Sequence, residues 1–319
     1  MIGSYERAAE LLSAAESVCV VTHVRPDADA IGSAAALTMA LTGLGTKVRA
    51  FVGQTAAIPE NLRTIPGAEL VELSDTLPQE CDLIVTVDCG SVERTGLLAQ
   101  AIIDRREKVL VLDHHASNEG FGADNLVDTV ESTTLVLYEL FALINAPISE
   151  PMAHALYAGL MTDTGSFRWG SPRMHRVAAE FMEFGLDTKQ IAADLLDHVT
   201  VDDLHFFGRA LSGLQIRRAG DHTVAILIAD HESTTVASQS AVETLVDFVR
   251  TLEGTTLGAV FKEQKPGTWA VSLRSNQADV SRIAGVLGGG GHVPAAGYTT
   301  YGTREDAVLQ LLATLRGAE

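Results

Sequence analysis

The sequence predicts an α/β protein with a parallel-sheet domain followed by a smaller α/β domain. Fully apolar runs at 83–87 (LIVTV) and 109–112 (VLVL) are typical of strands that are buried on both faces. Stretches rich in alanine and leucine separate such runs, which is the alternation expected of βαβ units. The length of 319 residues, 46% of them hydrophobic, is enough for two cores.

The first half of the chain carries the parallel-sheet pattern. A short helix leads into the first strand. The predicted strands are 18–22, 47–52, 83–87 and 109–112, and the predicted longer helices are 30–44, 133–145 and 151–162. Gly43 and Gly45 mark the end of the first long helix. Ligands of such sheets bind beyond the carboxyl ends of the strands, so the residues that follow the apolar runs are the candidates for function.

The second half begins with helical periodicity over 187–214, without a strand signal. Predicted strands follow at 224–228, 257–263 and 269–274, with helices at 241–252 and 304–316. We therefore place the first domain at 1–190, a linker helix at 191–213 and the second domain at 214–319.

The composition and charge of the chain argue against some classes of binding partner. The formal net charge is −18 and Lys and Arg form no block, whereas proteins that bind long nucleic acids usually present a basic face. Small anionic substrates remain compatible if metal ions supply local positive charge. No apolar run reaches the roughly 18 residues of a membrane span, and the N-terminus lacks the pattern of a secretory signal. We expect a cytoplasmic protein that binds neither membranes nor long nucleic acids.

Four polar clusters follow predicted strands or helices of the first half. Taken singly, each aspartate has an ordinary alternative as a helix cap or a turn residue. Taken together, the elements should end at one edge of a sheet and bring the clusters to one site. Phe167 and Trp169 follow the last cluster, and we expect them in the core, with stacking on a base as the alternative. In chain order, the clusters contain His23, Asp27 and Asp29, then Asp88, then Asp113, His114 and His115, then Asp163.

The residue types in these clusters indicate a metal site. Carboxylates mixed with imidazoles suit Mn²⁺ better than Mg²⁺, and the absence of cysteine ligands argues against structural zinc. So many anionic groups need cations in order to share a cleft. Two divalent ions would neutralise them, activate a water and hold a phosphoryl group for in-line attack. The predicted ligands are His23, Asp27, Asp29, Asp88, His114 and Asp163.

The second half has a glycine run at 288–291, followed by a histidine. Backbone N–H groups of glycines approach an anion closely, and His292 adds a side-chain donor. Arg274 offers a planar fork for a phosphate or a base, and Ser275 offers a hydroxyl. The alternative is a tight glycine turn beside an incidental histidine.

These motifs resemble those of a known family. HVRPDADAIGS, VDCG, LDHH and TDTGSF are similar to the four motifs of the DHH phosphoesterases. GGGGHVPAAG at 288–297 is similar to the signature of the DHHA1 domain, and SLRSN at 272–276 most resembles the NrnA-type subfamily. The resemblance spans nearly the whole chain. It implies an active site in the cleft between a DHH domain and a DHHA1 domain.

The resemblance also implies a role for each matched residue. It implies two Mn²⁺ ions per chain, with Mg²⁺ or Co²⁺ as substitutes. His115 would face the scissile phosphate and assist the leaving oxygen, and Asp113 would support the histidines. The terminal phosphate and base of the substrate would be bound by Arg274, Ser275, Gly290, Gly291 and His292. The implied ligands are His23, Asp27 and Asp88 for one ion and Asp29, Asp88, His114 and Asp163 for the other, so that Asp88 bridges.

The NrnA type implies a phosphodiesterase that cuts short oligoribonucleotides to 5′-mononucleotides. It also implies removal of the 3′-phosphate of 3′-phosphoadenosine 5′-phosphate (pAp). Actinobacterial relatives act on linear or cyclic dinucleotides such as c-di-AMP, and the resemblance implies a homodimer. Three alternatives stay open: an inorganic pyrophosphatase of the same superfamily, a processive single-strand exonuclease, and a catalytically silent nucleotide-binding sensor. The pyrophosphatase would lack the GGGGH and SLRS segments.

Overall fold

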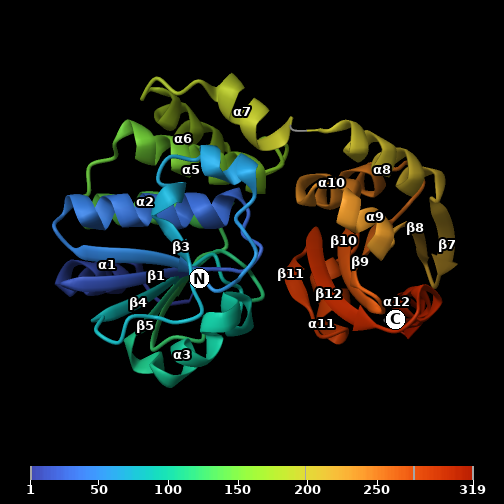
Figure 1. Ribbon diagram of the computed structural model, residues 1–319, viewed down its shortest axis with the longest axis horizontal. Helices are drawn as coiled ribbons and strands as arrows, with labels where there is room; N and C mark the ends of the chain where they lie inside the picture. Colours follow the sequence, from blue (N-terminus) through green and yellow to red (C-terminus); the bar gives the residue numbers. More distant parts are fainter. Residues whose placement is uncertain (1, 198, 276, 318–319) are drawn as a thin grey trace. The chain divides into compact units, whose positions relative to one another are not determined.

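The computed structural model describes residues 2–197, 199–275 and 277–317 and divides into two compact units, Met1–Asp197 and His198–Glu319. Figure 1 shows each unit as a sheet with helices packed against it. In the described part of the chain, no helix is both long and apolar enough to cross a membrane. Asn276, the last residue of the SLRSN segment, lies outside the described residues.

The first unit contains a six-stranded sheet in which every pair of neighbouring strands is parallel. From edge to edge the strands are β3 (Val71–Leu73), β2 (Lys47–Val52), β1 (Ser17–Thr22), β4 (Leu83–Val87), β5 (Val109–Asp113) and β6 (Asp124–Val127). The chain moves outward from β1 to β3 and then returns to β4 on the other side of β1. The carboxyl ends of β1 and β4 therefore flank the point where the strand order reverses, which is where open parallel sheets bind ligands.

The longest helix of this unit, α2, is buried along most of its length, from Ala28 to Thr38 without interruption. Its small side chains allow close packing on α5: a Cβ at Gly32 would lie 2.4 Å from the carbonyl oxygen of Ala155. The α-helices of the unit are α1 (Tyr5–Ala14), α2 (Ala28–Gly43), α3 (Ala99–Asp104), α4 (Thr133–Leu143), α5 (Glu150–Asp163), α6 (Pro172–Met182) and α7 (Thr188–Leu196). The 3₁₀ helices are η1 (Glu60–Thr64), η2 (Ala68–Leu70), η3 (Val92–Leu98) and η4 (Arg106–Lys108).

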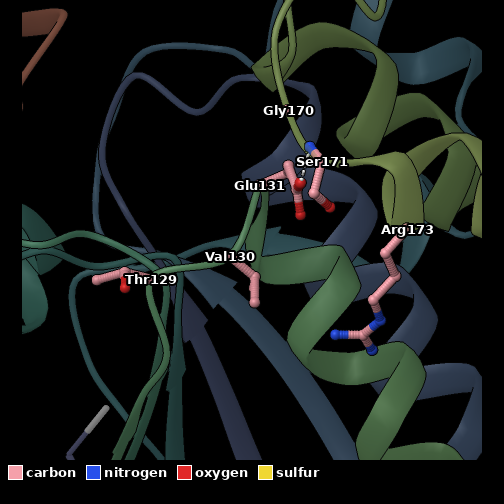
Figure 2. A pocket seen from close by; sticks show the side chains of 6 residues that line it. All are labelled: Thr129, Val130, Glu131, Gly170, Ser171 and Arg173. Atoms are coloured by element: carbon pink, nitrogen blue, oxygen red, sulfur yellow. Dashed lines mark hydrogen bonds between the residues drawn. The ribbon is translucent and has the colours of Figure 1, made fainter.

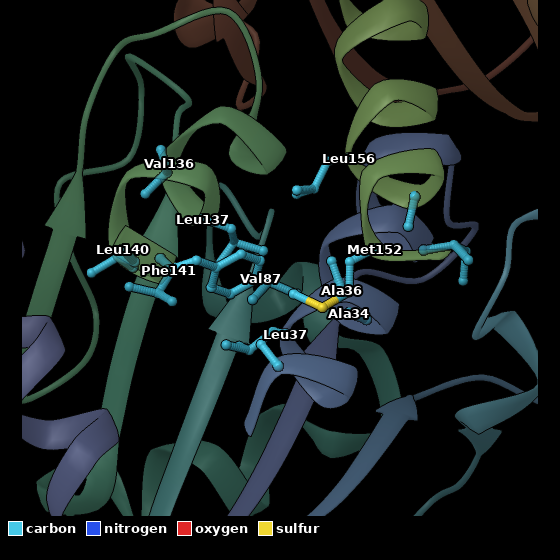
Figure 3. Close-up of a cluster of buried hydrophobic side chains, with 14 of the residues drawn as sticks. Ala34, Ala36, Leu37, Val87, Val136, Leu137, Leu140, Phe141, Met152 and Leu156 are labelled. Carbon is cyan, nitrogen blue, oxygen red and sulfur yellow. The ribbon is translucent and has the colours of Figure 1, made fainter. Parts of the chain in front are cut away.

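Both faces of the first sheet are covered. Because side chains alternate along a strand, Val18 and Val20 of β1 belong to one hydrophobic cluster, whereas Cys19 and Val21 belong to another. Figure 3 shows part of the first cluster, where side chains of α2, α4 and α5 surround Val87 of β4. The predicted parallel sheet with helices on both faces is therefore confirmed.

The second unit contains a mixed sheet that is also covered on both faces. Only β8 and β9 run parallel among its described neighbouring strands. Helices α11 and α12 pack on one face, and α8 and α10 pack on the other. In sheet order the strands are β11 (Gly290–His292), β12 (Ala295–Tyr301), β10 (Thr268–Arg274), β9 (Leu257–Lys265), β8 (His222–Ala229) and β7 (Gln215–Ala219). The helices are α8 (Val201–Ser212), α9 (His231–Val236), α10 (Gln239–Arg250), α11 (Val280–Val286) and α12 (Arg304–Gly317).

The stretch 191–213, predicted as one linker helix, contains parts of two helices. Helix α7 ends at Leu196 and α8 begins at Val201. The hydroxyl of Thr200 caps α8 by accepting a hydrogen bond from the backbone N–H of Asp203 at 3.1 Å, so a new helix starts there. His198 lies outside the described residues. The domain boundaries at 190 and 214 stay a prediction.

Asp203 connects the start of α8 to the start of α10. Its buried carboxylate accepts hydrogen bonds from the backbone N–H groups of Thr200 at 2.9 Å and Ser238 at 2.7 Å. Burial raises the pKa of Asp203, but these hydrogen bonds outweigh burial and hold the pKa below its ordinary value. The carboxylate therefore stabilises the fold only while it is ionised.

We expect Asp203→Ala to lower the free energy of unfolding by about 1–3 kcal/mol at neutral pH, because two N–H groups lose a charged acceptor. The folded-state pKa is depressed below the unfolded value of about 3.9. The contribution is therefore present above that pH and is lost as the pH falls through the folded-state pKa. Urea unfolding of the full chain, followed by circular dichroism over a series of pH values, measures both effects.

The control is Asp202→Ala, which removes an exposed carboxylate from the same helical turn. Asp202→Ala should change the free energy of unfolding by no more than about 0.5 kcal/mol. An equal loss in the two variants would show that charge at this helix end, and not the hydrogen bonds of Asp203, is what stabilises the unit.

Candidate active site

The structure brings the six predicted metal ligands together at the carboxyl edge of the first sheet. Each ligand follows a strand, or lies at the end of a helix, next to that edge. The positions are His23 after β1, Asp27 at the N-cap of α2, Asp29 in the first turn of α2, Asp88 after β4, His114 after β5 and Asp163 at the end of α5. Residues up to 140 positions apart therefore share one site.

The side chains form two groups that meet at Asp88. In the first, the Nε2 atom of His23 lies 3.7 Å from Asp27 Oδ2 and 3.5 Å from Asp88 Oδ2. In the second, the Nε2 atom of His114 lies 3.6 Å from Asp88 Oδ1. The same nitrogen lies 3.1 Å from Asp163 Oδ2 and 3.8 Å from Asp29 Oδ2. The two oxygens of Asp88 therefore face two different imidazoles.

The backbone of Asp88 has a left-handed conformation, with φ of 58°. Few residues other than glycine adopt this region, and aspartate is among those that do so more readily. The backbone N–H of Asp88 donates to the carbonyl oxygen of Leu112 at 3.1 Å, which ties this turn to β5. The left-handed turn ends β4 and places a 2% exposed carboxylate between the two histidines.

Backbone carbonyls hold the two imidazoles. The Nδ1 atom of His23 lies 3.0 Å from the carbonyl oxygen of Val24, and that of His114 lies 3.2 Å from the carbonyl oxygen of Val130. A proton on Nδ1 donates to such an oxygen and leaves the lone pair on Nε2. In both rings Nε2 is the nitrogen that faces the carboxylates. For His114 this contact favours the tautomer that a metal-binding histidine needs. For His23, Nδ1 also lies 3.0 Å from Nη2 of Arg94, which can only donate, so the ring lies between a carbonyl acceptor and a guanidinium donor.

The start of α4 holds Asp29, a contact that the sequence did not predict. The backbone N–H of Thr133 donates to Asp29 Oδ2 at 2.7 Å, and that of Thr134 donates to Oδ1 at 3.0 Å. The hydroxyl of Thr133 also donates to Asp88 Oδ1 at 3.0 Å. Helix N-termini favour anions, so α4 offsets part of the cost of burying these carboxylates.

Gly159 of α5 packs directly against Asp29. A Cβ at this position would lie 2.6 Å from Asp29 Oδ1 and 2.6 Å from the Cγ2 atom of Thr134. Real Cβ atoms do not approach other atoms so closely, so a larger residue must displace the carboxylate. A glycine inside a predicted helix carries no signal for such a contact, because its partner is distant in the sequence.

His115, predicted to act on the substrate, lies beside the second group. Its Nδ1 atom lies 2.8 Å from Asp113 Oδ1 and 3.8 Å from Asp88 Oδ1. Asn118 donates to the other oxygen of Asp113 at 2.6 Å and thereby fixes that carboxylate. The side chain of His115 is 28% exposed, in contrast to 4% for His114. His115 is therefore oriented by protein on one side and accessible on the other.

Comparison with known proteins agrees with this geometry. The DHH family, N-terminal domain, matches residues 17–160, and the DHHA1 domain matches residues 223–317. The bifunctional oligoribonuclease and PAP phosphatase NrnA of Thermus thermophilus is 31% identical over 302 residues, which cover 92% of this chain and 87% of that protein. The chain belongs to the DHH family. Enzymes of this family are metal-dependent phosphoesterases, so the chain is an enzyme of that class.

Two further proteins are similar to the chain over most of its length. The cyclic-di-AMP phosphodiesterase GdpP of Geobacillus thermodenitrificans is 26% identical over 90% of this chain and 45% of that protein. The solved structure of an exopolyphosphatase-related protein from Bacteroides fragilis is similar at a TM-score of 0.85 and 24% identity, over 98% of this chain and 96% of that chain. The latter likeness confirms the predicted fold class.

Crowded carboxylates dominate the electrostatics of this DHH site. Burial raises the pKa of Asp29 well above its ordinary value, and the charge of Asp88 raises it further. Burial lowers the pKa of His23, but Asp27 and Asp88 outweigh burial and raise it to about 10. In the absence of cations, the site thus retains protons that reduce the repulsion between its carboxylates. Divalent cations would relieve the same repulsion, so the donor set fits bound metal ions.

Ser275 in the DHHA1 region does not fit its predicted role in substrate binding. Its hydroxyl donates to the carbonyl oxygen of Thr256 at 2.7 Å and accepts from the N–H groups of Gln277 at 2.9 Å and Ala278 at 2.7 Å. A serine hydroxyl has one donor and two acceptor positions, and all three are used here. Ser275 is 4% exposed and holds the loop after β10.

The other predicted substrate residues lie on strands of the second unit. Arg274 ends β10, whereas Gly290, Gly291 and His292 form the edge strand β11, which pairs with β12. Gly291 has φ of +138°, and a Cβ there would lie 2.6 Å from the carbonyl oxygen of Ala295. Glycine at 291 is therefore required by the strand pairing itself.

A pocket of about 400 Å³ lies in the first unit, and part of its wall is the segment that precedes α4. Figure 2 shows the residues around it, among which Glu131 accepts a hydrogen bond from the backbone N–H of Ser171. The predicted ligands do not line this pocket. Val130 connects the two, because it lines the pocket and its backbone carbonyl contacts His114. The lining residues are Thr129, Val130, Glu131, Gly170, Ser171 and Arg173.

We expect Gly159→Ala to weaken metal binding by about 10- to 100-fold, the range for residues that support metal ligands. The added methyl group would push Asp29 away from the N–H groups of Thr133 and Thr134. Calorimetric titration of the purified protein with Mn²⁺ measures the affinity.

Gly43→Ala is the matched control, because a Cβ at Gly43 meets no heavy atom within 4 Å. It should bind Mn²⁺ like the unmodified protein. Unchanged affinity in Gly159→Ala would contradict the proposed contact between Gly159 and a metal ligand.

Proposed function

We propose that this enzyme is a Mn²⁺-dependent phosphodiesterase and phosphomonoesterase for very short nucleotides. Its substrates would be oligoribonucleotides of a few residues and linear dinucleotides, which it cuts to 5′-mononucleotides, and pAp, from which it removes the 3′-phosphate. Two Mn²⁺ ions would bind per chain, with Mg²⁺ or Co²⁺ as substitutes. The oligoribonuclease and PAP phosphatase activities of the Thermus thermophilus relative support this choice of substrates. The GdpP relative supports cyclic dinucleotides as a further class.

The position of Asp88 between two imidazoles is the observation that carries the proposal. Its Oδ2 atom faces His23 at 3.5 Å and its Oδ1 atom faces His114 at 3.6 Å. A carboxylate with one oxygen in each donor group is suited to bridge two cations. Two divalent ions bound there would supply the positive charge that lowers the pKa of a water and neutralises phosphoryl oxygens. Mn²⁺ accepts both carboxylate and imidazole ligands, which suits both groups.

His115 is the residue that we assign to the leaving group. Its Nδ1 atom donates to Asp113 at 2.8 Å, and we assign the contact with the substrate to Nε2, the other ring nitrogen. In the protonated ring, Nε2–H can donate to the leaving oxygen and stabilise its developing charge. Asp113 holds the ring in place and favours its protonated form.

The second unit would bind the rest of the substrate. We assign the terminal phosphate and base to Arg274, whose guanidinium is a planar donor, and to the strand of Gly290, Gly291 and His292. The formal charge of −18 and the absence of a Lys and Arg block are consistent with substrates too short to need a long basic groove. The homodimer implied by the family resemblance stays a prediction.

Two of the alternatives are weakened by particular observations. The match of the DHHA1 domain to residues 223–317, together with the GGGGH segment, is not expected of the pyrophosphatase. A silent sensor would have no need of two carboxylate–imidazole groups that share Asp88.

We expect Asp88→Asn to reduce kcat by about 10³-fold or more on RNAs of two to five nucleotides and on pAp. The bridging charge is lost, and metal ions supply several kcal/mol of transition-state stabilisation. Removal of metal with a chelator should have a similar effect, and Mn²⁺ should restore the unmodified enzyme alone. Steady-state assays that separate 5′-mononucleotide products measure the loss.

Asp75→Asn makes the same chemical change at an exposed position of the same unit and should leave kcat unchanged. Absence of turnover on every short RNA and on pAp in the presence of Mn²⁺ would refute the proposed function. Asp88→Ala distinguishes an enzyme from a sensor. If the protein is a sensor, the variant would retain its affinity for nucleotides, and the unmodified protein would show no turnover.

A further inference from the structure

The segment after Asp163 has an uncommon backbone. Gly165, Ser166 and Phe167 have φ values of 55°, 62° and 62°, so three successive residues are left-handed. Glycine adopts this region freely, but serine and phenylalanine do so at a cost. Such backbone persists only where the surrounding contacts impose it, and it is concentrated at functional sites.

The turn folds Trp169 back onto the start of the segment. The indole N–H donates to the carbonyl oxygen of Asp163 at 2.9 Å. A Cβ at Gly165 would lie 2.1 Å from the Cη2 atom of the indole and 2.4 Å from Cζ3, so the ring edge rests against the glycine. The hydrogen bond and the glycine contact hold the ring at two separate places.

Packing in the core does not account for this tryptophan, although the sequence favoured that role. Trp169 is 44% exposed, whereas Trp269, the other tryptophan of the chain, is 2% exposed. Phe167, from the same turn, does pack inward, with its ring centroid 5.4 Å from that of Tyr157. The turn therefore separates its two aromatic residues: Phe167 is partly buried against the core, whereas nearly half of Trp169 stays at the surface.

The held ring is attached to a residue of the metal centre. The carbonyl that accepts the indole N–H belongs to Asp163, whose carboxylate lies 3.1 Å from His114 Nε2. We propose that Trp169 is a stacking platform for a nucleobase of the substrate, next to the site of phosphate cleavage. Bases of every kind stack on an aromatic face, so such a platform binds short oligonucleotides without selecting their sequence. The inference rests on the proposed function, because it assigns one contact of the same substrate.

Fluorescence tests the platform without requiring turnover. In Trp269→Phe, Trp169 is the only tryptophan, so its emission reports on that ring alone. With Mg²⁺ present, 5′-AMP should quench this emission saturably, and ribose 5-phosphate, which lacks a base, should not. If Trp269→Phe does not fold, the difference in quenching between the unmodified protein and Trp169→Phe gives the same information.

Calorimetric titration with 5′-AMP separates failure of the platform from failure of the proposed function. Binding of AMP without quenching would overturn the platform and leave the function intact. Equal quenching by AMP and ribose 5-phosphate would also overturn it. If no nucleotide binds and no short RNA is cut, both proposals fail together.

Kinetics give the second test. Trp169→Ala should raise KM for a diribonucleotide by about 5- to 150-fold, the equivalent of about 1–3 kcal/mol of stacking, and should change kcat by less than about threefold. Trp169→Phe should recover most of the loss, and KM for an abasic dinucleotide should not change. Phe184→Ala, at a 40% exposed phenylalanine of the same unit, is the control. Equal losses on the two substrates, or weaker Mn²⁺ binding, would show that Trp169 only supports Asp163 and would overturn the proposal.

Discussion

Carboxylates buried side by side are the constraint on which the first unit depends. Asp29 is fully buried and Asp88 is 2% exposed, and both lie within 4 Å of the same imidazole nitrogen. Buried like charges are costly unless other groups compensate them. The protein compensates them with two N–H groups of α4 and with imidazoles held by backbone carbonyls. These groups offset part of the cost of burying the carboxylates. Divalent cations would offset the rest, so metal binding would stabilise the first unit at the active site itself.

The order of the strands makes this arrangement feasible. β1 and β4 are neighbours in the sheet although residues 23–82 separate them, so His23 and Asp88 follow neighbouring strands at the same edge. The small residues of α2 bring its first turn close to α5, where Gly159 leaves room for the carboxylate of Asp29. Packing distances in the core therefore determine ligand positions in the site. A single methyl group added at Gly159 would change both the helix packing and the position of Asp29.

The sequence predicted the parts of the molecule that depend on local pattern. The apolar runs identified β1, β4 and β5 because strands buried on both faces have continuous hydrophobic sequences. β2 was also predicted, although Lys47 and Arg49 in its first half are exposed. The short strands β3 and β6 and the helix α6 were not predicted, since edge strands and amphipathic surface helices carry weaker signals. The ligand candidates were predicted from their position after these elements, but their supports were not. Thr133 contacts Asp29 across 104 positions, and nothing near either residue indicates that contact. Ser275 was predicted to bind the substrate because the sequence does not reveal its contacts within the loop. Those contacts use the donor and both acceptor positions of its hydroxyl.

Electron paramagnetic resonance of the Mn²⁺-loaded enzyme tests the central claim, that Asp88 bridges two metal ions, most directly. Two Mn²⁺ ions that share a carboxylate lie about 3.5–4 Å apart in two-metal sites and are exchange-coupled. Titration should therefore end at two ions per chain with the spectrum of a coupled pair, and Asp88→Asn should lose that spectrum. A single bound ion, or two ions that keep the hyperfine pattern of isolated Mn²⁺, would contradict the account.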